Sequence, residues 1–143
     1  MAKQEFLMLA DGAESTNGKI YILGGGSDRH RAAAFPSQLK ADIALGVLVP
    51  WGETNQRHAL VLRIEDEDAT PMARIESEFD LGRPSGAIPG QDLRFLVAIK
   101  GPFPVARAGA YKISMDIDGV TQEPPFRFWV EESRPSTRSR GSA

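Results

Sequence analysis

Apolar and polar residues alternate with a period of two in several short runs of this sequence, and no long segment shows the period of a helix. The clearest run is "ARIESEFDL" at 73–81, where apolar residues alternate with mostly charged ones. A similar alternation occupies 93–99, and 43–49 is apolar at nearly every position. Alternation predicts a strand with one buried face, whereas a continuous apolar run predicts a strand buried on both faces. Turn residues separate the runs, so the chain is expected to fold as a series of short strands.

The segment "YKISMDIDGVTQEPPFRF" predicts a β-hairpin. Its Asp-Gly pair at 118–119 fits a two-residue type I′ turn, in which both central residues need a positive φ. Such a turn places Ile117 opposite Val120 and Tyr111 opposite Phe126. This register sorts both strands into one apolar and one polar face. The Pro-Pro pair before Phe126 has no N–H donors, so the second strand is expected to be an edge strand or bulged.

Seven or eight strands of this kind predict an all-β protein, an antiparallel β-sandwich that is immunoglobulin-like in its general architecture. The segment "AGAYKI" has the Gly-x-Tyr that opens a late strand in many immunoglobulin-like domains. A single sandwich domain would occupy residues 1–130, and the polar residues 131–143 would form a disordered tail. The segment "HRAAAF" has room for one helical turn before Pro36.

Composition narrows the classes of function. A net charge of -2 over 143 residues argues against a nucleic-acid partner, because nucleic-acid-binding domains are usually strongly basic. The absence of cysteine excludes disulfides, a thiol nucleophile and a thiolate metal site. The apolar run "FLMLA" near the N-terminus is too short for a signal-peptide core or a membrane span. We therefore expect a cytoplasmic protein that binds neither membrane nor nucleic acid.

Three consecutive glycines, Gly24, Gly25 and Gly26, follow a short apolar run in "KIYILGGGSDRH". A phosphate-binding P-loop would continue with Lys and then Ser or Thr at the start of a helix, and a dinucleotide-binding loop needs a different glycine spacing. Neither pattern is present. Because glycine allows positive φ and close backbone approach, we expect a bend or bulge here rather than an anion cradle.

The chain has two histidines, His30 and His58. Ser27, Asp28 and His30 are too close in sequence to converge as a hydrolase triad, and no Gly-x-Ser-x-Gly motif is present. His58 follows a polar stretch at the start of a predicted strand, where an exposed side chain without a special role is expected. Neither histidine has the spacing of a metal ligand. The sequence therefore predicts no catalytic residue, no metal site and no cofactor.

The acidic run "EDED" at 65–68 has two interpretations. Clustered carboxylates in a loop can bind calcium, but the glycine and glutamate positions of an EF-hand loop are missing. The favoured interpretation is a solvated hairpin turn closed by "DATP".

Two tryptophans, Trp51 and Trp129, lie at strand positions that sequence alone does not explain. Trp129 falls on the polar face of the last strand, where a large aromatic can anchor a partner or cover the open end of the sandwich. Trp51 lies at a strand end, close to Asn55. The candidate binding surface comprises Gly24, Gly25, Gly26, Arg29, His30, Trp51 and Asn55.

Five segments together resemble a family of small bacterial proteins classified as a domain of unknown function. They are "FLMLADGAESTNGKIYILGGG", "VPWGETN", "LVLRIEDED", "GRP" and "FP…GAYKISMDIDG". The opening signature is a Leu-rich strand, Ala-Asp, a Gly-Lys-Leu-Tyr-like strand and the glycine triplet. The resemblance covers roughly residues 5–130. It implies a compact bacterial β domain without an assigned activity, so no catalytic residue is carried over.

The function predicted from the sequence is a non-catalytic binding or protein-interaction module with a protein partner. The alternative is a small-ligand-binding protein or an enzyme whose site lies around residues 24–30. An exposed edge strand would also allow a homo-oligomer.

Overall fold

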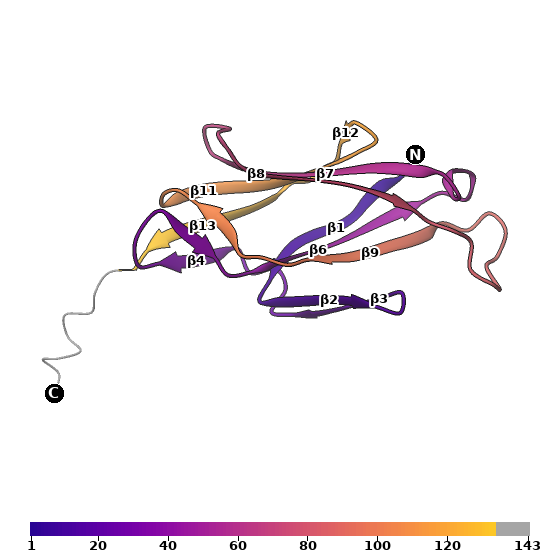
Figure 1. Ribbon diagram of the computed structural model, residues 1–143, viewed down its shortest axis with the longest axis horizontal. Helices are drawn as coiled ribbons and strands as arrows, with labels where there is room; N and C mark the ends of the chain where they lie inside the picture. Colours follow the sequence, from indigo (N-terminus) through magenta and orange to yellow (C-terminus); the bar gives the residue numbers. More distant parts are fainter. Residues whose placement is uncertain (134–143) are drawn as a thin grey trace, which may run out of the picture.

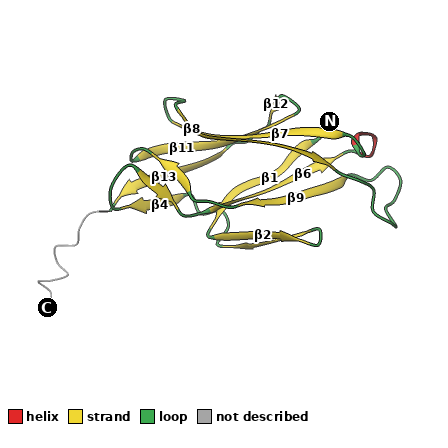
Figure 2. Cartoon of the chain, viewed as in Figure 1, coloured by secondary structure: helices red, strands yellow, loops and turns green. Residues whose placement is uncertain are grey.

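The computed structural model describes residues 1–133, and these residues form strands and one short helical turn (Figures 1 and 2). In chain order the strands are β1 (Lys3–Ala10), β2 (Gly12–Thr16), β3 (Lys19–Leu23), β4 (Arg29–Ala32), β5 (Ser37–Leu39), β6 (Asp42–Val49), β7 (Arg57–Asp66), β8 (Pro71–Asp80), β9 (Leu93–Ile99), β10 (Phe103–Val105), β11 (Gly109–Ile117), β12 (Val120–Thr121) and β13 (Phe126–Glu132). The helical turn is the 3₁₀ segment η1 (Trp51–Glu53). The predicted all-β class is confirmed.

Two sheets form the sandwich. The smaller sheet has the order β1-β6-β9, and the larger has the order β4-β13-β11-β7-β8, with β12 paired to β11. All these pairings are antiparallel except that of β4 with β13, which is parallel. Two further strand pairs, β5 with β10 and β2 with β3, complete the fold. In Figure 1, β7, β8 and β11 lie above the layer of β1, β6 and β9.

The inner faces of the two sheets enclose one hydrophobic core. Its fully buried side chains come from β1, β6, β7, β11 and β13 and include Leu9, Ile43, Leu45, Leu62, Ile64, Ile113, Met115 and Phe128. The β2–β3 hairpin covers the other face of the smaller sheet, where Ala10, Ala13 and Ala44 form a second buried cluster. Strand β6 is therefore buried on both faces, as its continuous apolar sequence predicts.

The turn of the predicted hairpin is confirmed, but the register beyond it is different. Asp118 and Gly119 have φ values of 51° and 81°, and Ile117 pairs with Val120. Tyr111, however, lies opposite Phe128 rather than Phe126. An irregular segment around the two prolines separates β12 from β13 and shifts the pairing by two residues. Because side chains alternate with a period of two, this shift leaves the apolar face intact.

The start of β11 contains a feature typical of immunoglobulin-like sandwiches. The Tyr111 hydroxyl donates a hydrogen bond to the backbone carbonyl of Arg107, four residues upstream, and the Arg107 N–H donates to the same hydroxyl at 3.2 Å. This arrangement resembles the tyrosine corner of those domains. It ties the loop before β11 to a side chain that is buried in the core.

Three sequence-based expectations about local structure were wrong. The segment predicted as a helical turn contains β4, which pairs with β13 through a hydrogen bond from the Trp129 N–H to the Asp28 carbonyl (2.8 Å). Several strands are too short to show alternation, so the structure has more than the seven or eight expected. The last strand ends at Glu132, two residues into the predicted tail, and the remainder of that tail lies outside the described residues.

The glycine triplet forms the bend that returns the chain from the β2–β3 hairpin to the end of β1. The Gly26 N–H donates to the Leu9 carbonyl at 2.8 Å. Gly24 has a φ of 64°, and a Cβ atom added there would collide with the Asp11 side chain. The backbone geometry at Gly24 therefore requires glycine.

Replacing Gly24 tests this account. We expect Gly24→Ala to destabilise the protein by about 1 kcal/mol or more, because alanine is strained at positive φ and meets Asp11. The matched control is Gly12→Ala in β2, where an added Cβ has nothing within 4 Å and φ is not positive. Urea unfolding of both variants measures the difference, and equal stabilities would contradict a structural role for Gly24.

Candidate functional site

The residues of the predicted binding surface divide between the two ends of the sandwich. Gly26 is hydrogen-bonded to Leu9, and Leu9 pairs with Ile43 at the start of β6. Arg29 and His30 follow Gly26 closely in the chain and lie in β4. Trp51 and Asn55 follow the other end of β6. Since a strand rises about 3.3 Å per residue, β6 separates the two groups by about 20 Å. The seven predicted residues therefore do not form one surface.

Trp51 and Asn55 take part in the packing of the end at which β6 finishes. The Arg83 guanidinium lies 3.9 Å from the centre of the Trp51 ring, and it also donates to the Trp51 carbonyl at 2.7 Å. The Asn55 N–H donates to the Leu81 carbonyl at 2.9 Å. These contacts hold η1 against the segment that follows β8.

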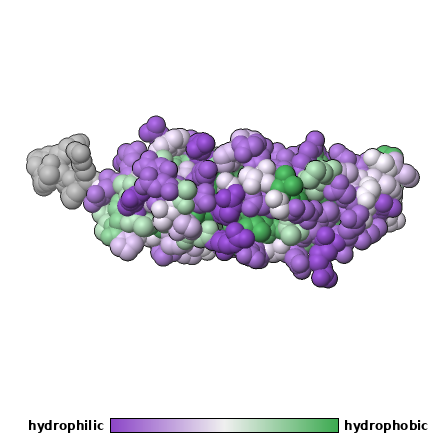
Figure 3. Space-filling model, turned by 90° about the horizontal axis from the view of Figure 1, so that it is seen from above, coloured by the Kyte–Doolittle hydropathy of each residue, from purple (hydrophilic) through white to green (hydrophobic). Residues whose placement is uncertain are grey.

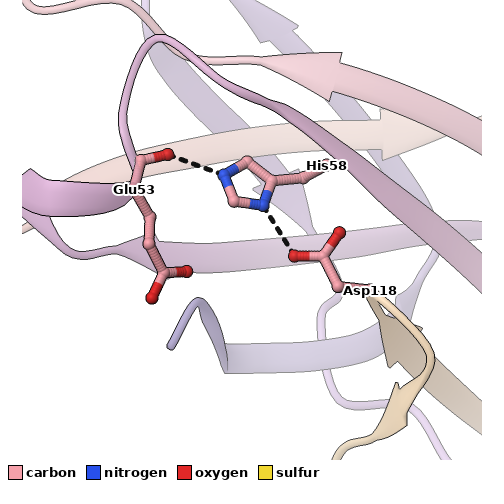
Figure 4. Close-up of side chains that lie close together, drawn as sticks. All are labelled: Glu53, His58 and Asp118. Atoms are coloured by element: carbon pink, nitrogen blue, oxygen red, sulfur yellow. Dashed lines mark hydrogen bonds and ion pairs between the residues drawn. The ribbon is translucent and has the colours of Figure 1, made fainter.

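A buried histidine at this same end has hydrogen-bond partners at both ring nitrogens. His58 lies near the start of β7 and is only 3% exposed. Its Nδ1 is 2.7 Å from a carboxylate oxygen of Asp118, and its Nε2 is 2.7 Å from the backbone carbonyl of Glu53 (Figure 4). The sequence-based expectation of an exposed His58 was wrong, because η1 and the β11–β12 turn close over the start of β7.

The surroundings of His58 set its charge. Both ring nitrogens face oxygen atoms that accept hydrogen bonds, so both are satisfied only when the ring is protonated on each nitrogen. Burial disfavours the charged ring, but the hydrogen bonds to Asp118 and to the Glu53 carbonyl outweigh it and raise the pKa of His58 above its ordinary value. Burial likewise disfavours a charged Asp118, yet its bonds to His58 and to the Ala59 N–H lower the pKa of that carboxyl.

This arrangement, the His58 clamp, joins η1, β7 and the β11–β12 turn. Glu53, His58 and Asp118 place potential metal-ligand atoms within 4.8 Å of one another. A metal ion at Nδ1, however, would have to displace the proton shared with Asp118. The Glu53 carboxylate already accepts the Ala2 N–H at 2.8 Å. With both nitrogens engaged, His58 is not free to act as a general base, and the geometry is that of a structural ion pair.

The sequence gives no signal for the clamp. His58 and Asp118 are separated by 60 residues, and the Asp-Gly pair already has a sufficient explanation in the turn that it forms. Only the pairing of β7 with β11, which sets Leu60 beside Ile117, brings the two side chains together.

The acidic run at 65–68 forms the β7–β8 hairpin turn, as the favoured interpretation predicts. Asp66 is 6% exposed and accepts hydrogen bonds from the backbone N–H groups of Thr70 and Asp68, both at 2.9 Å. The bond from Thr70 is the main cause of the lowered pKa of Asp66. Arg107 lies 3.1 Å from Asp66 and 2.7 Å from Asp68, so a cation already offsets part of the negative charge of this turn.

The opposite end of the larger sheet has an open surface. Trp129 lies on the outer face of β13 and is 43% exposed, and its register partner on β4 is Arg29. A cleft of about 540 Å³ adjoins it and is lined by Arg29, Ala108, Gly109, Trp129, Val130, Glu131 and Glu132. Figure 3, which views the molecule from the side of β7 and β8, shows a mostly hydrophilic surface with small hydrophobic areas.

Fold and site together define a small β-sandwich domain with a buried histidine paired to an exposed aspartate at one end and an open cleft at the other. The chain belongs to a family of unknown function, DUF6941, whose model matches residues 5–127. Among curated proteins, none matches the chain. The match confirms the resemblance to an uncharacterised domain family, and the bacterial origin stays a prediction. Within residues 1–133, no helix is long and apolar enough to cross a membrane.

The His58 clamp generates a prediction about stability and pH. A folded-state pKa above the unfolded one means that the contribution of His58 is complete below about pH 6.5 and is lost as pH rises through the folded pKa. The stability gap between the wild type and His58→Gln should therefore be larger at about pH 5.5 than at about pH 8.5. Urea unfolding at both pH values measures the gap.

Two further variants test whether the pH dependence comes from the contact between His58 and Asp118. His30→Gln is the control and should keep the pH dependence of the wild type, because His30 lies outside the clamp. Its ring is 3.1 Å from the Ser27 carbonyl and packs edge-on against Phe128. Asp118→Asn should reduce the dependence and cost about 1–3 kcal/mol at the lower pH, since it removes a charged acceptor from a buried donor. A gap between wild type and His58→Gln that is the same at both pH values would contradict the charged clamp.

Proposed function

We propose that this domain is a non-catalytic protein-interaction module that binds its partner at the end of the larger sheet where β4 and β13 lie. The observation that carries the proposal is the exposure of Trp129 beside a cleft, on a face that is otherwise polar. Tryptophan is among the residues most enriched in binding hot spots, because it buries a large area at little entropic cost.

The charges around Trp129 support a protein partner. Four cationic residues share the outer face of the larger sheet with Trp129, according to the strand register. They are Arg29 and Arg31 of β4, Arg127 of β13 and Lys112 of β11. Among the described residues, only Arg29 of these four cations has an ion pair, at 3.6 Å from Glu131. Cations around an exposed aromatic anchor favour a partner surface that is acidic at its rim and apolar at its centre.

The catalytic alternative around residues 24–30 has less support. Arg29 lines one groove at this end and His30 lines another. A ligand-binding site around residues 24–30 would need such a lining. An anion cradle, however, needs successive backbone N–H groups that converge on one point. The Gly26 N–H instead donates to the Leu9 carbonyl, and the pairing of β2 with β3 extends to Leu23.

Self-association through β4 is disfavoured by charge. Two antiparallel β4 edges would set Arg29 and Arg31 of one copy against the same residues of another, and like charges directly opposite destabilise a sheet. A homo-oligomer through an edge strand would instead use β9, the edge of the smaller sheet, whose one charged residue is Arg94. A partner of different charge fits β4 better than a second copy.

Site-specific capture tests the proposal. An affinity-tagged chain is used to capture proteins from cells of the source organism, in parallel with Trp129→Ser and the matched control Tyr21→Ser. Tyr21 is 57% exposed on the β2–β3 hairpin, away from the cleft. We expect a partner that the wild type and Tyr21→Ser retain and that Trp129→Ser loses. Retention by Trp129→Ser together with loss by Tyr21→Ser would move the binding surface to the hairpin and contradict the proposal.

A further inference from the structure

The geometry points to a specific mode of binding: an extended, acidic segment of the partner adds to the free edge of β4 as a further strand, in the groove between β4 and β5. This inference rests on the proposed function, because it assumes that the β4–β13 end binds a protein. It goes further by naming the element that pairs and the chemistry of the segment that it accepts.

The direction of the hydrogen bonds shows which backbone groups of β4 are free. The carbonyls of Asp28 and Ala32 accept the N–H groups of Trp129 and Ser133, both at 2.8 Å. Backbone groups of successive residues in a strand point to opposite sides, so His30 also faces β13 whereas Arg29 and Arg31 face away. Within residues 1–133, the N–H and carbonyl groups of Arg29 and Arg31 have no backbone partner. They form an open pairing edge.

A groove of about 350 Å³ runs along this edge. One wall is formed by β4 and the residues after it, and the other by β5. Its apolar lining includes Leu39, Val105 and Val130, which are between 2% and 7% exposed. An extended segment in the groove would pair with β4 through its main chain and place alternate side chains against this apolar surface, as peptides do in strand addition.

The charge of the groove selects an acidic segment. Arg31 and Lys40 contribute cations to its lining, and no carboxylate lines it within the described part of the chain. Glu131 and Glu132 of β13 line neighbouring clefts, one of which Arg31 also lines. Among the described residues, Glu131 is ion-paired with Arg29, and neither Arg31 nor Lys40 has an ion pair. Glutamate or aspartate at alternate positions of the added strand would therefore meet uncompensated cations.

Other occupants fit less well. The chain's own residues 134–143, which lie outside the described part, carry three arginines and no acidic side chain, so they match the charge of the groove rather than complement it. Strand β8 of a second copy is acidic, but it is paired with β7 in the larger sheet. Placing β8 in the groove would therefore bring the rest of that sheet against β5. A nucleic acid would make no use of the free main-chain groups of β4, and the net charge of -2 disfavours it.

The test uses a capped, fluorescein-labelled peptide of alternating glutamate and valine, with binding measured by fluorescence anisotropy. Two derivatives carry N-methyl groups on all valines or on all glutamates. In strand addition the backbone N–H groups of only the valines, or of only the glutamates, face β4. The derivative methylated on that residue type should therefore lose at least about tenfold in affinity, and the other derivative should keep it. A purely electrostatic contact would treat the two derivatives alike.

Variants of the protein locate the peptide. Arg31→Glu combined with Lys40→Glu should abolish binding. The charge-matched control, Lys3→Glu combined with Lys19→Glu, should not change it, because both lysines are exposed and lie outside the groove. Trp129→Ser should leave peptide binding intact, because Trp129 lies on the outer face and does not line the groove. Hydrogen exchange should show slower exchange of the Arg29 and Arg31 amides when the peptide is bound.

Several results would overturn the inference. They are no binding to the wild type, equal affinity of the two methylated derivatives, equal competition by a single-stranded oligothymidylate, and self-association of the chain that blocks the peptide. None of these results predicts whether Trp129→Ser loses the partner in the capture experiment. Failure of strand addition therefore remains distinguishable from failure of the interaction surface.

Discussion

The burial of β6 on both faces is the constraint on which the rest of the structure depends. Its inner face contributes Ile43 and Leu45 to the main core, and its outer face contributes Ala44 to the cluster beneath the β2–β3 hairpin. The smaller sheet is thus enclosed between the larger sheet and the hairpin. Both faces of β6 are consequently closed to a partner, and the larger sheet is the one whose outer face remains open.

The two ends of the sandwich differ in how they use charge. At one end a charged His58 is buried, and its ring also stacks on Phe79 with 5.2 Å between ring centres. The clamp gives both ring nitrogens of His58 a hydrogen-bond partner and joins η1 to the β11–β12 turn. At the other end, among the described residues, Arg29 is ion-paired with Glu131, whereas Arg31, Arg127 and Lys112 have no ion pair. We therefore assign a structural role to the first end, and the proposed binding surface lies at the second.

The sequence predicted the features that arise from local pattern. Alternation identified the long strands, the continuous apolar run identified β6 as doubly buried, and the Asp-Gly pair identified its turn. The predicted faces of β13 are correct although its register differs by two residues after the prolines, because a shift of two residues leaves each side chain on the same face. These signals succeed because each depends on residues close together in the chain.

The features that sequence did not predict depend on distant pairing. Strand β4 is four residues long, has no apolar alternation, and exists because β13 offers it a parallel edge. His58 becomes buried and charged because η1 and a turn 60 residues away close over it. The candidate surface was assembled from residues that β6 holds apart. Its Arg29 and His30 nevertheless lie at the end that the structure leaves open.

Hydrogen exchange on the complex with the captured partner tests the central claim most directly. The amides of each strand are compared in the free chain and in the complex, because a newly paired edge is protected from exchange. The account predicts new protection at Arg29 and Arg31 in β4, with β8, β9 and η1 unchanged. Protection confined to β8, β9 or η1, with β4 unaffected, would contradict it.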